Sequence, residues 1–292
     1  MPVFIRLIAI LTIKADIMES NVNWLQVFFQ CRENVIAHIT PMLKKLKEPQ
    51  PDLGKGAGGD PMKLIDLVAE KAIVEVLLMH ALSFTLISEE SGIKKFGEKC
   101  EYCYVTVDPI DGTTNLIRGL PFYCTSIAVS SIPTLSQIRA GMVSDLFHGT
   151  TFTATHGGGA YCAGQKILTS ASLSLEQSVV GLDLNTVNFN RVASEVSDLV
   201  RSAGHIRHFG ANALELCYVA QGLTEAFVDI RGKLRTTDVA AALLILKEAG
   251  GTISTPDGKS LDAKLDPKQT LNFVASGNAK IHGEILKSLR VK

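Results

Sequence analysis

The stretch Val105-Thr106-Val107-Asp108-Pro109-Ile110-Asp111-Gly112-Thr113-Thr114-Asn115 predicts the end of a buried β-strand followed by a tight turn. The proline fixes its own φ and favours an extended backbone at Asp108. Asp108 and Asp111 flank the turn and can point at one site. The amides of Gly112 and Thr113 then begin a short helix, where an anion is well placed. Because Mg²⁺ prefers a few carboxylates together with phosphate oxygens, the stretch suits a site that holds divalent cations and a phosphate.

The same stretch also fits a turn whose aspartates cap a helix, because aspartate is common in turns. Two further acidic segments favour the metal site. One is Ser88-Glu89-Glu90-Ser91-Gly92, which follows a strand-like run at residues 83–87. The other is Thr236-Thr237-Asp238, which begins an apolar helix that extends to Ala249.

These three segments resemble those of the inositol monophosphatase family: Asp108 to Asn115, Glu89-Glu90-Ser91, and the helix from Asp238-Val239-Ala240-Ala241 to Glu248-Ala249-Gly250-Gly251. The family consists of Mg²⁺-dependent, lithium-sensitive phosphatases related to fructose-1,6-bisphosphatase. The resemblance extends from residue 22 to the end, and the three segments are specific only in combination. It implies an α+β half followed by an α/β half, layered as an α-β-α-β-α sandwich, with the metal site where the halves meet.

The resemblance implies two or three Mg²⁺ ions in this site. The ligands expected for the first ion are Glu89, Asp108 and the backbone carbonyl of Ile110. Those expected for the second are Asp108, Asp111 and Asp238. A third, weaker ion is expected near Glu89 and Asp66. Such ions lower the pKa of a water molecule and neutralise charge on the phosphate oxygens.

The resemblance also implies which residues orient the attacking water and bind the phosphate. Thr113, hydrogen-bonded near Glu89 or Asp66, is expected to orient the attacking water, without a covalent phosphoenzyme. The phosphate is expected to bind the amides of Gly112 and Thr113, beside Asp111. Considered without the family, Asp66 is equally well explained as a solvated aspartate that the helix dipole favours.

Three cations precede the late aspartate, in Asp229-Ile230-Arg231-Gly232-Lys233-Leu234-Arg235-Thr236-Thr237-Asp238. They fit either a solvated loop or a clamp for a second phosphate, which arginine binds well through its planar fork. The pattern is similar to that of an archaeal branch of the family that hydrolyses both fructose 1,6-bisphosphate and inositol monophosphate. That similarity implies substrate contacts from Arg207, Asn212 and Arg231. His208 is more often a structural residue in such a position.

We therefore expect a phosphatase for fructose 1,6-bisphosphate and inositol 1-phosphate. The nearest alternative is a 3′(2′),5′-bisphosphate nucleotidase, for which no slot for a base can be located in the sequence. The other alternative is a regulatory member of the family that has lost catalysis. Family members usually form homodimers, so a homodimer is expected.

Composition limits the partners of the protein. The 292 residues carry a formal net charge of zero, with a sequence pI near 7.0, which argues against nucleic acid and anionic membranes. The six cysteines are too sparse for a stapled secreted domain. Cys100-Glu101-Tyr102-Cys103 lacks the second pair that a zinc site needs, which leaves loop cysteines or a local redox bond. A cytoplasmic protein is expected.

The chain divides into three predicted parts. Residues 1–21 form an extension that is too short to span a bilayer; it is an additional segment, or translation begins at Met18. Residues 22–170 form the α+β half, and residues 171–292 form the α/β half. A Pro- and Gly-rich loop at residues 48–60 lacks the Gly-Lys-Ser/Thr of a phosphate loop and is expected to act as a lid over the site. Apolar periodicity predicts helices at 24–46, 62–79, 192–202, 212–221, 239–249 and 281–289, with strands between them, including 226–230.

Overall fold

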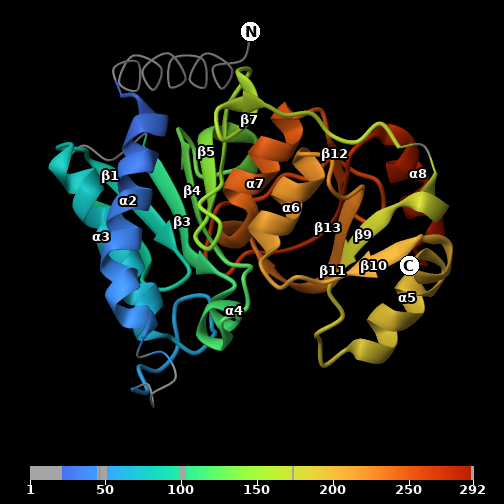
Figure 1. The fold of residues 1–292 in the computed structure, drawn as a ribbon, viewed down its shortest axis with the longest axis horizontal. Helices are drawn as coiled ribbons and strands as arrows, with labels where there is room; N and C mark the ends of the chain where they lie inside the picture. The colour runs from blue at the N-terminus through green and yellow to red at the C-terminus, as the bar shows by residue number, and fades with distance from the viewer. Residues whose placement is uncertain (1–21, 45, 47–50, 99–102, 173, 291–292) are drawn as a thin grey trace, which may run out of the picture.

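The computed structural model describes residues 22–44, 46, 51–98, 103–172 and 174–290. It has five layers in the order helix, sheet, helix, sheet, helix (Figure 1). The first layer contains α2 (Trp24–Leu43) and α3 (Leu64–Met79). The middle layer contains α6 (Asn212–Ala220) and α7 (Thr236–Glu248), and the last contains α5 (Phe189–Ser202) and α8 (Ala279–Ser288). The predicted α+β half followed by an α/β half, stacked as an α-β-α-β-α sandwich, is confirmed.

The first sheet has eight strands in the order β2-β1-β3-β4-β5-β6-β7-β8. Their bounds are β1 Phe84–Ser88, β2 Gly92–Phe96, β3 Tyr104–Asp111, β4 Cys124–Ser130, β5 Ile138–Asp145, β6 Thr151–Thr155, β7 Gly159–Cys162 and β8 Gln165–Lys166. All neighbours are antiparallel except β1 and β3, which run parallel with Ser88 opposite Val107. This register places the residue that follows β1 beside Asp108, because parallel strands end at the same edge of a sheet.

The second sheet has the order β10-β9-β11-β13-β12. Its strands are β9 Val179–Leu182, β10 His205–Arg207, β11 Ala226–Arg235, β12 Thr252–Ser254 and β13 Thr270–Ser276. The prediction for β11 ended too early, at residue 230. The strand continues to Arg235 through a register shift between Asp229 and Leu234, within which Gly232 has a φ of +69°. The segment with three cations is therefore the second part of a strand, which leads directly into α7.

The middle layer packs between the two sheets, so α7 is buried on all sides over most of its length. Its residues from Thr236 to Leu246 are all buried. The helix approaches β5 so closely that a Cβ at Gly141 would lie 3.1 Å from the Cα of Ala241. A side chain at that position would push the helix away from the sheet, and with it the acidic residue in the first turn of α7. The core between the sheets thus fixes one side of the site.

Short helices complete the fold: α4 (Thr113–Arg118) and the 3₁₀ turns Leu135–Gln137 and Leu175–Gln177. None of the helices in the described part of the chain has the length and apolar run needed to span a bilayer. The predicted extension at residues 1–21, the start at Met18 and Cys100 of the Cys-x-x-Cys motif lie outside the described residues. The division of the chain at residue 170 stays a prediction.

Candidate active site

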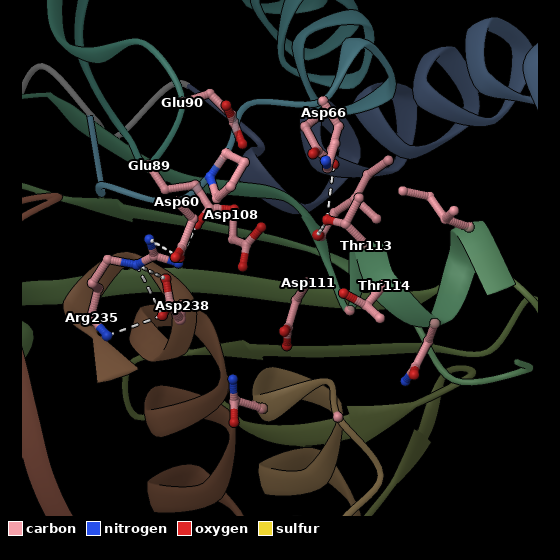
Figure 2. A pocket seen from close by; sticks show the side chains of 18 of the residues that line it. Asp60, Asp66, Glu89, Glu90, Asp108, Asp111, Thr113, Thr114, Arg235 and Asp238 are labelled. Carbon is pink, nitrogen blue, oxygen red and sulfur yellow. Dashed lines mark hydrogen bonds and ion pairs between the residues drawn. The ribbon is translucent and has the colours of Figure 1, made fainter. Parts of the chain in front are cut away.

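Three acidic side chains meet at the edge where β1 and β3 end. Glu89 follows β1, Asp108 lies in β3, and Asp238 lies in the first turn of α7. One carboxylate oxygen from each lies within 4.8 Å of the others. Figure 2 shows these side chains pointing into the same cavity from the two halves of the chain. Three convergent carboxylates at this spacing are a ligand set for a hard divalent cation.

Asp111 is held beside this cluster by the start of α6. Its Oδ2 accepts a hydrogen bond of 2.6 Å from the amide of Ala213, and the thiol of Cys124 lies 3.8 Å from the same oxygen. The backbone of Asn212 contributes a further hydrogen bond. These contacts fix the carboxylate of Asp111 from the middle helix layer, across the boundary between the halves.

Gly112 makes the turn after Asp111 possible. It has a φ of +87°, a left-handed conformation that favours glycine. A Cβ here would also lie 3.0 Å from the carbonyl oxygen of Phe122 and from the Cβ of Ala211. Thr113 then begins α4, as the sequence predicts. Gly112 and Thr113 line the cavity beside the carboxylates, where the sequence predicts that their amides bind a phosphate.

Asp66 and Thr113 meet on the side of the cavity opposite Arg235 and Asp238 (Figure 2). The hydroxyl oxygen of Thr113 lies 3.1 Å from Oδ1 of Asp66 and 2.9 Å from the carbonyl oxygen of Ile110. Asp66 is buried in the first turn of α3, with 2% of its surface exposed. The geometry thus supplies the partner that the sequence assigned to Thr113, and the catalytic roles of both residues stay predictions.

The carboxylates of the cluster repel one another in the absence of a cation. Burial, and then neighbouring carboxylates, raise the pKa of Asp66 to about 8 and that of Glu89 to about 7. Burial also raises the pKa of Asp111 to about 8, and burial followed by Glu89 holds the pKa of Asp108 well above its usual range. A cation bound nearby would oppose these shifts, because an opposite charge favours the ionised form of each carboxyl group.

Asp108 indicates directly that the cluster fits a metal. The residue has 2% of its surface exposed, and its Oδ1 has no hydrogen-bond partner among the described residues. A buried carboxylate oxygen without a partner is costly unless a cation binds it. The oxygen set and the unpartnered oxygen together fit a hard divalent cation, with Glu89, Asp108 and Asp238 as the residues that would hold it.

Arg235, one of the three cations that precede Asp238, lies among the carboxylates, a contact that the sequence did not predict. Its guanidinium contacts Glu89, lies 3.1 Å from Oδ1 of Asp238 and 2.9 Å from Oδ2 of Asp60. Burial alone would lower the pKa of Arg235, but Asp238 and Glu89 together raise it. A signal was present, because residues three apart at the start of a helix face each other. Arg235 is therefore the cation that balances the cluster in the metal-free protein.

The Pro- and Gly-rich loop contacts the acidic turn after β1 through its residues 57 and 58. The amide of Gly58 donates to the carbonyl of Glu89 at 2.7 Å, and the amide of Ala57 donates to that of Glu90 at 3.0 Å. A Cβ on Gly58 would lie 2.2 Å from Nη1 of Arg235. The loop also brings Asp60 into the cavity. Its contact with the site agrees with a lid, and the lid function itself stays a prediction.

The far side of the cavity, away from the carboxylate cluster, is lined from the second half of the chain. The whole cavity has a volume of about 610 Å³, and this side presents Asp183, Asn185, His208, Gly210 and Asn212. His208 thus lines the cavity, although the sequence favoured a structural role. Arg207 is exposed and donates to its neighbouring carbonyl, and neither it nor Arg231 lines the cavity in this structure. The substrate contacts assigned to these two arginines stay predictions.

Replacing Arg235 with methionine is expected to lower stability most when no metal is present. The change removes the cation from Glu89 and Asp238, and breaking a buried ion pair costs about 3–5 kcal/mol. Added Mg²⁺ replaces the lost charge, so the deficit should shrink. Calorimetric melting temperatures with EDTA and with Mg²⁺ measure both effects.

The matched control for this variant is Arg201→Met, which removes an arginine from an exposed ion pair with Asp198. Exposed pairs contribute about 0–1 kcal/mol, so its melting temperature should remain near that of the wild type in both conditions. A metal-free Arg235→Met protein as stable as the wild type would show that Arg235 does not balance the cluster.

A model of the inositol monophosphatase family matches residues 24–291. A fructose-1,6-bisphosphatase/inositol-1-monophosphatase from Methanothermobacter thermautotrophicus is 36% identical over 277 residues, which cover 92% of this chain and 97% of that protein. A bifunctional NADP phosphatase/NAD kinase from Methanococcus maripaludis is 32% identical over 248 residues, which cover 79% of this chain and 43% of that protein.

Solved structures agree with this match. A crystal structure of an inositol monophosphatase–fructose 1,6-bisphosphatase has a TM-score of 0.81 and 26% identity, and covers 92% of this chain and 100% of that chain. The extragenic suppressor protein suhB from Bartonella henselae has a TM-score of 0.78 and 26% identity, with coverage of 92% and 99%. The chain belongs to the inositol monophosphatase family.

Proposed function

We propose that the protein is a Mg²⁺-dependent phosphatase that hydrolyses the phosphomonoesters of fructose 1,6-bisphosphate and inositol 1-phosphate. The observation that carries the proposal is the cluster of Glu89, Asp108 and Asp238, in which a buried oxygen of Asp108 lacks a partner among the described residues. Support for the substrates comes from the relative in Methanothermobacter thermautotrophicus, whose described activities are these two.

The residues that would hold two or three Mg²⁺ ions are Glu89, Asp108, Asp111, Asp238 and the carbonyl of Ile110, with Asp66 beside a third ion. When bound, the ions supply charge that neutralises the phosphate oxygens and lowers the pKa of a water molecule. Asp111 is pre-positioned by the amide of Ala213, so it needs little reorganisation. Phosphoryl transfer depends mostly on such positioning and electrostatics.

Thr113 and Asp66 would orient the attacking water. The hydrogen bond between them fixes the threonine hydroxyl at the edge of the cavity, where its oxygen can accept a hydrogen bond from water. The amides of Gly112 and Thr113 would bind the phosphate, with Asp111 beside it. Attack by water in this arrangement needs no nucleophilic side chain.

Two alternatives remain to be tested beside this proposal. A phosphatase for a phosphorylated nucleotide is supported by relatives such as the one from Methanococcus maripaludis, whose described activities include NADP phosphatase. A regulatory protein without turnover is the other, although the acidic residues expected of the metal site are all present. We further propose a cytoplasmic homodimer, on family expectation.

Phosphate release tests the proposal directly. Fructose 1,6-bisphosphate, inositol 1-phosphate, adenosine 3′,5′-bisphosphate and NADP are compared with Mg²⁺ and with EDTA. Release from the first two is expected with Mg²⁺ only. An Asp111→Asn variant should lose it, because the change weakens a predicted metal ligand that lies against the start of α6.

Each result has a distinct meaning. Release from only the nucleotides would keep the metal chemistry and overturn the proposed substrates. Absence of release from all four, in a folded protein that binds Mg²⁺, would favour the regulatory alternative. Release that persists with EDTA would contradict metal dependence altogether.

A further inference from the structure

Arg231 is paired with two carboxylates in this structure. Its guanidinium contacts both Asp183 and Asp229, and its Nε lies 3.0 Å from Oδ2 of Asp229. Only 8% of its side chain is exposed. Burial alone would lower the pKa of Arg231, but the hydrogen bonds that Arg231 donates to Asp229 and the charges of both aspartates raise it. The positive charge of Arg231 is therefore already neutralised from within the protein.

The two partners of Arg231 occupy different places. Asp229 is fully buried in β11, and it also accepts a hydrogen bond of 2.9 Å from the backbone amide of Arg231. Asp183 follows β9 and lines the cavity. Its Oδ1 accepts a hydrogen bond of 2.7 Å from the amide of Asn185 and lies 3.7 Å from Nε2 of His208. Asp183 is thus the partner that faces the cavity.

A carboxylate and a phosphate compete for the same positions on a guanidinium, since both accept hydrogen bonds from its planar fork. A substrate with a second phosphate would have to displace Asp183 from Arg231, or lie against a negative charge. A substrate with only hydroxyl groups on that side meets no such conflict. Asp183, Asn185 and His208 all line this side and can exchange hydrogen bonds with neutral hydroxyls.

We propose that Asp183 is a specificity-determining residue, whose carboxylate occupies the position on Arg231 that a second phosphate would need. Arg231 is then a clamp that is closed on the protein's own side chain, and the site favours monophosphates of polyols over bisphosphates. This inference rests on the proposed function, since it concerns how that phosphatase chooses between its substrates.

The test uses two substrates that differ only in the second phosphate, fructose 1-phosphate and fructose 1,6-bisphosphate. The selectivity is the ratio of kcat/KM for the bisphosphate to kcat/KM for the monophosphate. In Asp183→Asn this ratio is expected to rise about tenfold, mainly through a lower KM for the bisphosphate, as Arg231 becomes available. An unchanged or lower ratio overturns the proposal.

Two further variants separate the clamp from a general effect of charge. In the double variant Asp183→Asn with Arg231→Met, the ratio of kcat/KM for the bisphosphate to that for the monophosphate should return to the wild-type value. A raised ratio in the double variant would overturn the role of Arg231. Asp60→Asn also removes one negative charge from the cavity, but on the side of Arg235. It should change kcat/KM for both substrates by similar factors, and a matching rise of the ratio would overturn the specific role of Asp183.

Binding without turnover keeps the inference testable if the proposed phosphatase function fails. Calorimetric titration with fructose 1,6-bisphosphate and with fructose 1-phosphate, with Ca²⁺ in place of Mg²⁺, gives two dissociation constants for each protein. Asp183→Asn should tighten binding of the bisphosphate by about tenfold relative to the monophosphate. Equal dissociation constants in variant and wild type would overturn the inference, independently of any loss of activity.

Discussion

Replacing Asp108 with asparagine should reduce phosphate release by about a thousandfold or more. Asp108 lies at the centre of the cluster, and its unpartnered Oδ1 is the oxygen that most needs a cation. An amide has no charge and binds Mg²⁺ poorly. Metal ions contribute several kcal/mol to such reactions, and a loss of about 4 kcal/mol is a thousandfold in rate. Steady-state kinetics with saturating Mg²⁺ measures the loss.

The same variant should be more stable than the wild type when metal is absent. Asparagine removes a buried carboxyl group whose ionised form is disfavoured by burial and by the charges of Glu89, Asp111 and Asp238. Functional sites commonly lower the stability of a protein in this way. The expected pattern is a higher melting temperature in EDTA together with a smaller increase on addition of Mg²⁺.

The control for this pattern is Asp145→Asn, which changes an equally buried aspartate away from the cavity. Asp145 accepts hydrogen bonds of 2.8 Å from the amides of Phe147 and His148. Its loss should lower the melting temperature and leave the response to Mg²⁺ intact. If Asp108→Asn behaved like Asp145→Asn, the carboxylate of Asp108 would be structural and the proposed metal site would be wrong.

Local sequence was sufficient to predict those parts of the site whose backbone conformation depends on neighbouring residues. The proline after Asp108 and the left-handed Gly112 determine the strand, turn and helix within eight residues. The apolar helix after Thr237 was predicted for the same reason, since burial between two sheets leaves a continuous apolar run. Family resemblance then linked these segments to the acidic turn after β1, which spacing alone could not do.

The remaining features depend on contacts between distant parts of the chain. The pairing of Asp183 with Arg231 spans 48 residues, and nothing beside Asp183 in the sequence indicates it. Strand β2 was missed because its Ile93, Lys94 and Lys95 are exposed at a sheet edge, where the apolar alternation of a half-buried strand is absent. Because of the register shift in β11, the alternation of side chains along the strand does not predict that Arg235 points toward the acidic cluster. Each of these is decided by tertiary packing rather than by local preference.

Stability of the metal-free protein is expected to fall as the pH rises from about 4 to about 8. The folded-state pKa values of Asp66 and Asp111 are raised to about 8, mainly by burial, and that of Glu89 to about 7. Unfolded carboxylates titrate near pH 4, so in this window the folded state binds more protons than the unfolded state. Stability then falls with rising pH, because deprotonation favours the unfolded chain.

Mg²⁺ should reverse this dependence, since it binds the deprotonated carboxylates of the folded state only. An ion at a hundred times its dissociation constant contributes about 2.7 kcal/mol, which corresponds to roughly 5–10 °C in melting temperature. The gain should be large at pH 8 and small at pH 5, where protons compete for the ligands. Calorimetry at pH 5, 6.5 and 8, with EDTA or Mg²⁺ and with K⁺ at equal ionic strength as the control, measures it. A metal-free melting temperature that rises from pH 5 to pH 8 would contradict the sign, because the buried carboxylates would then be stabilised as anions without any metal.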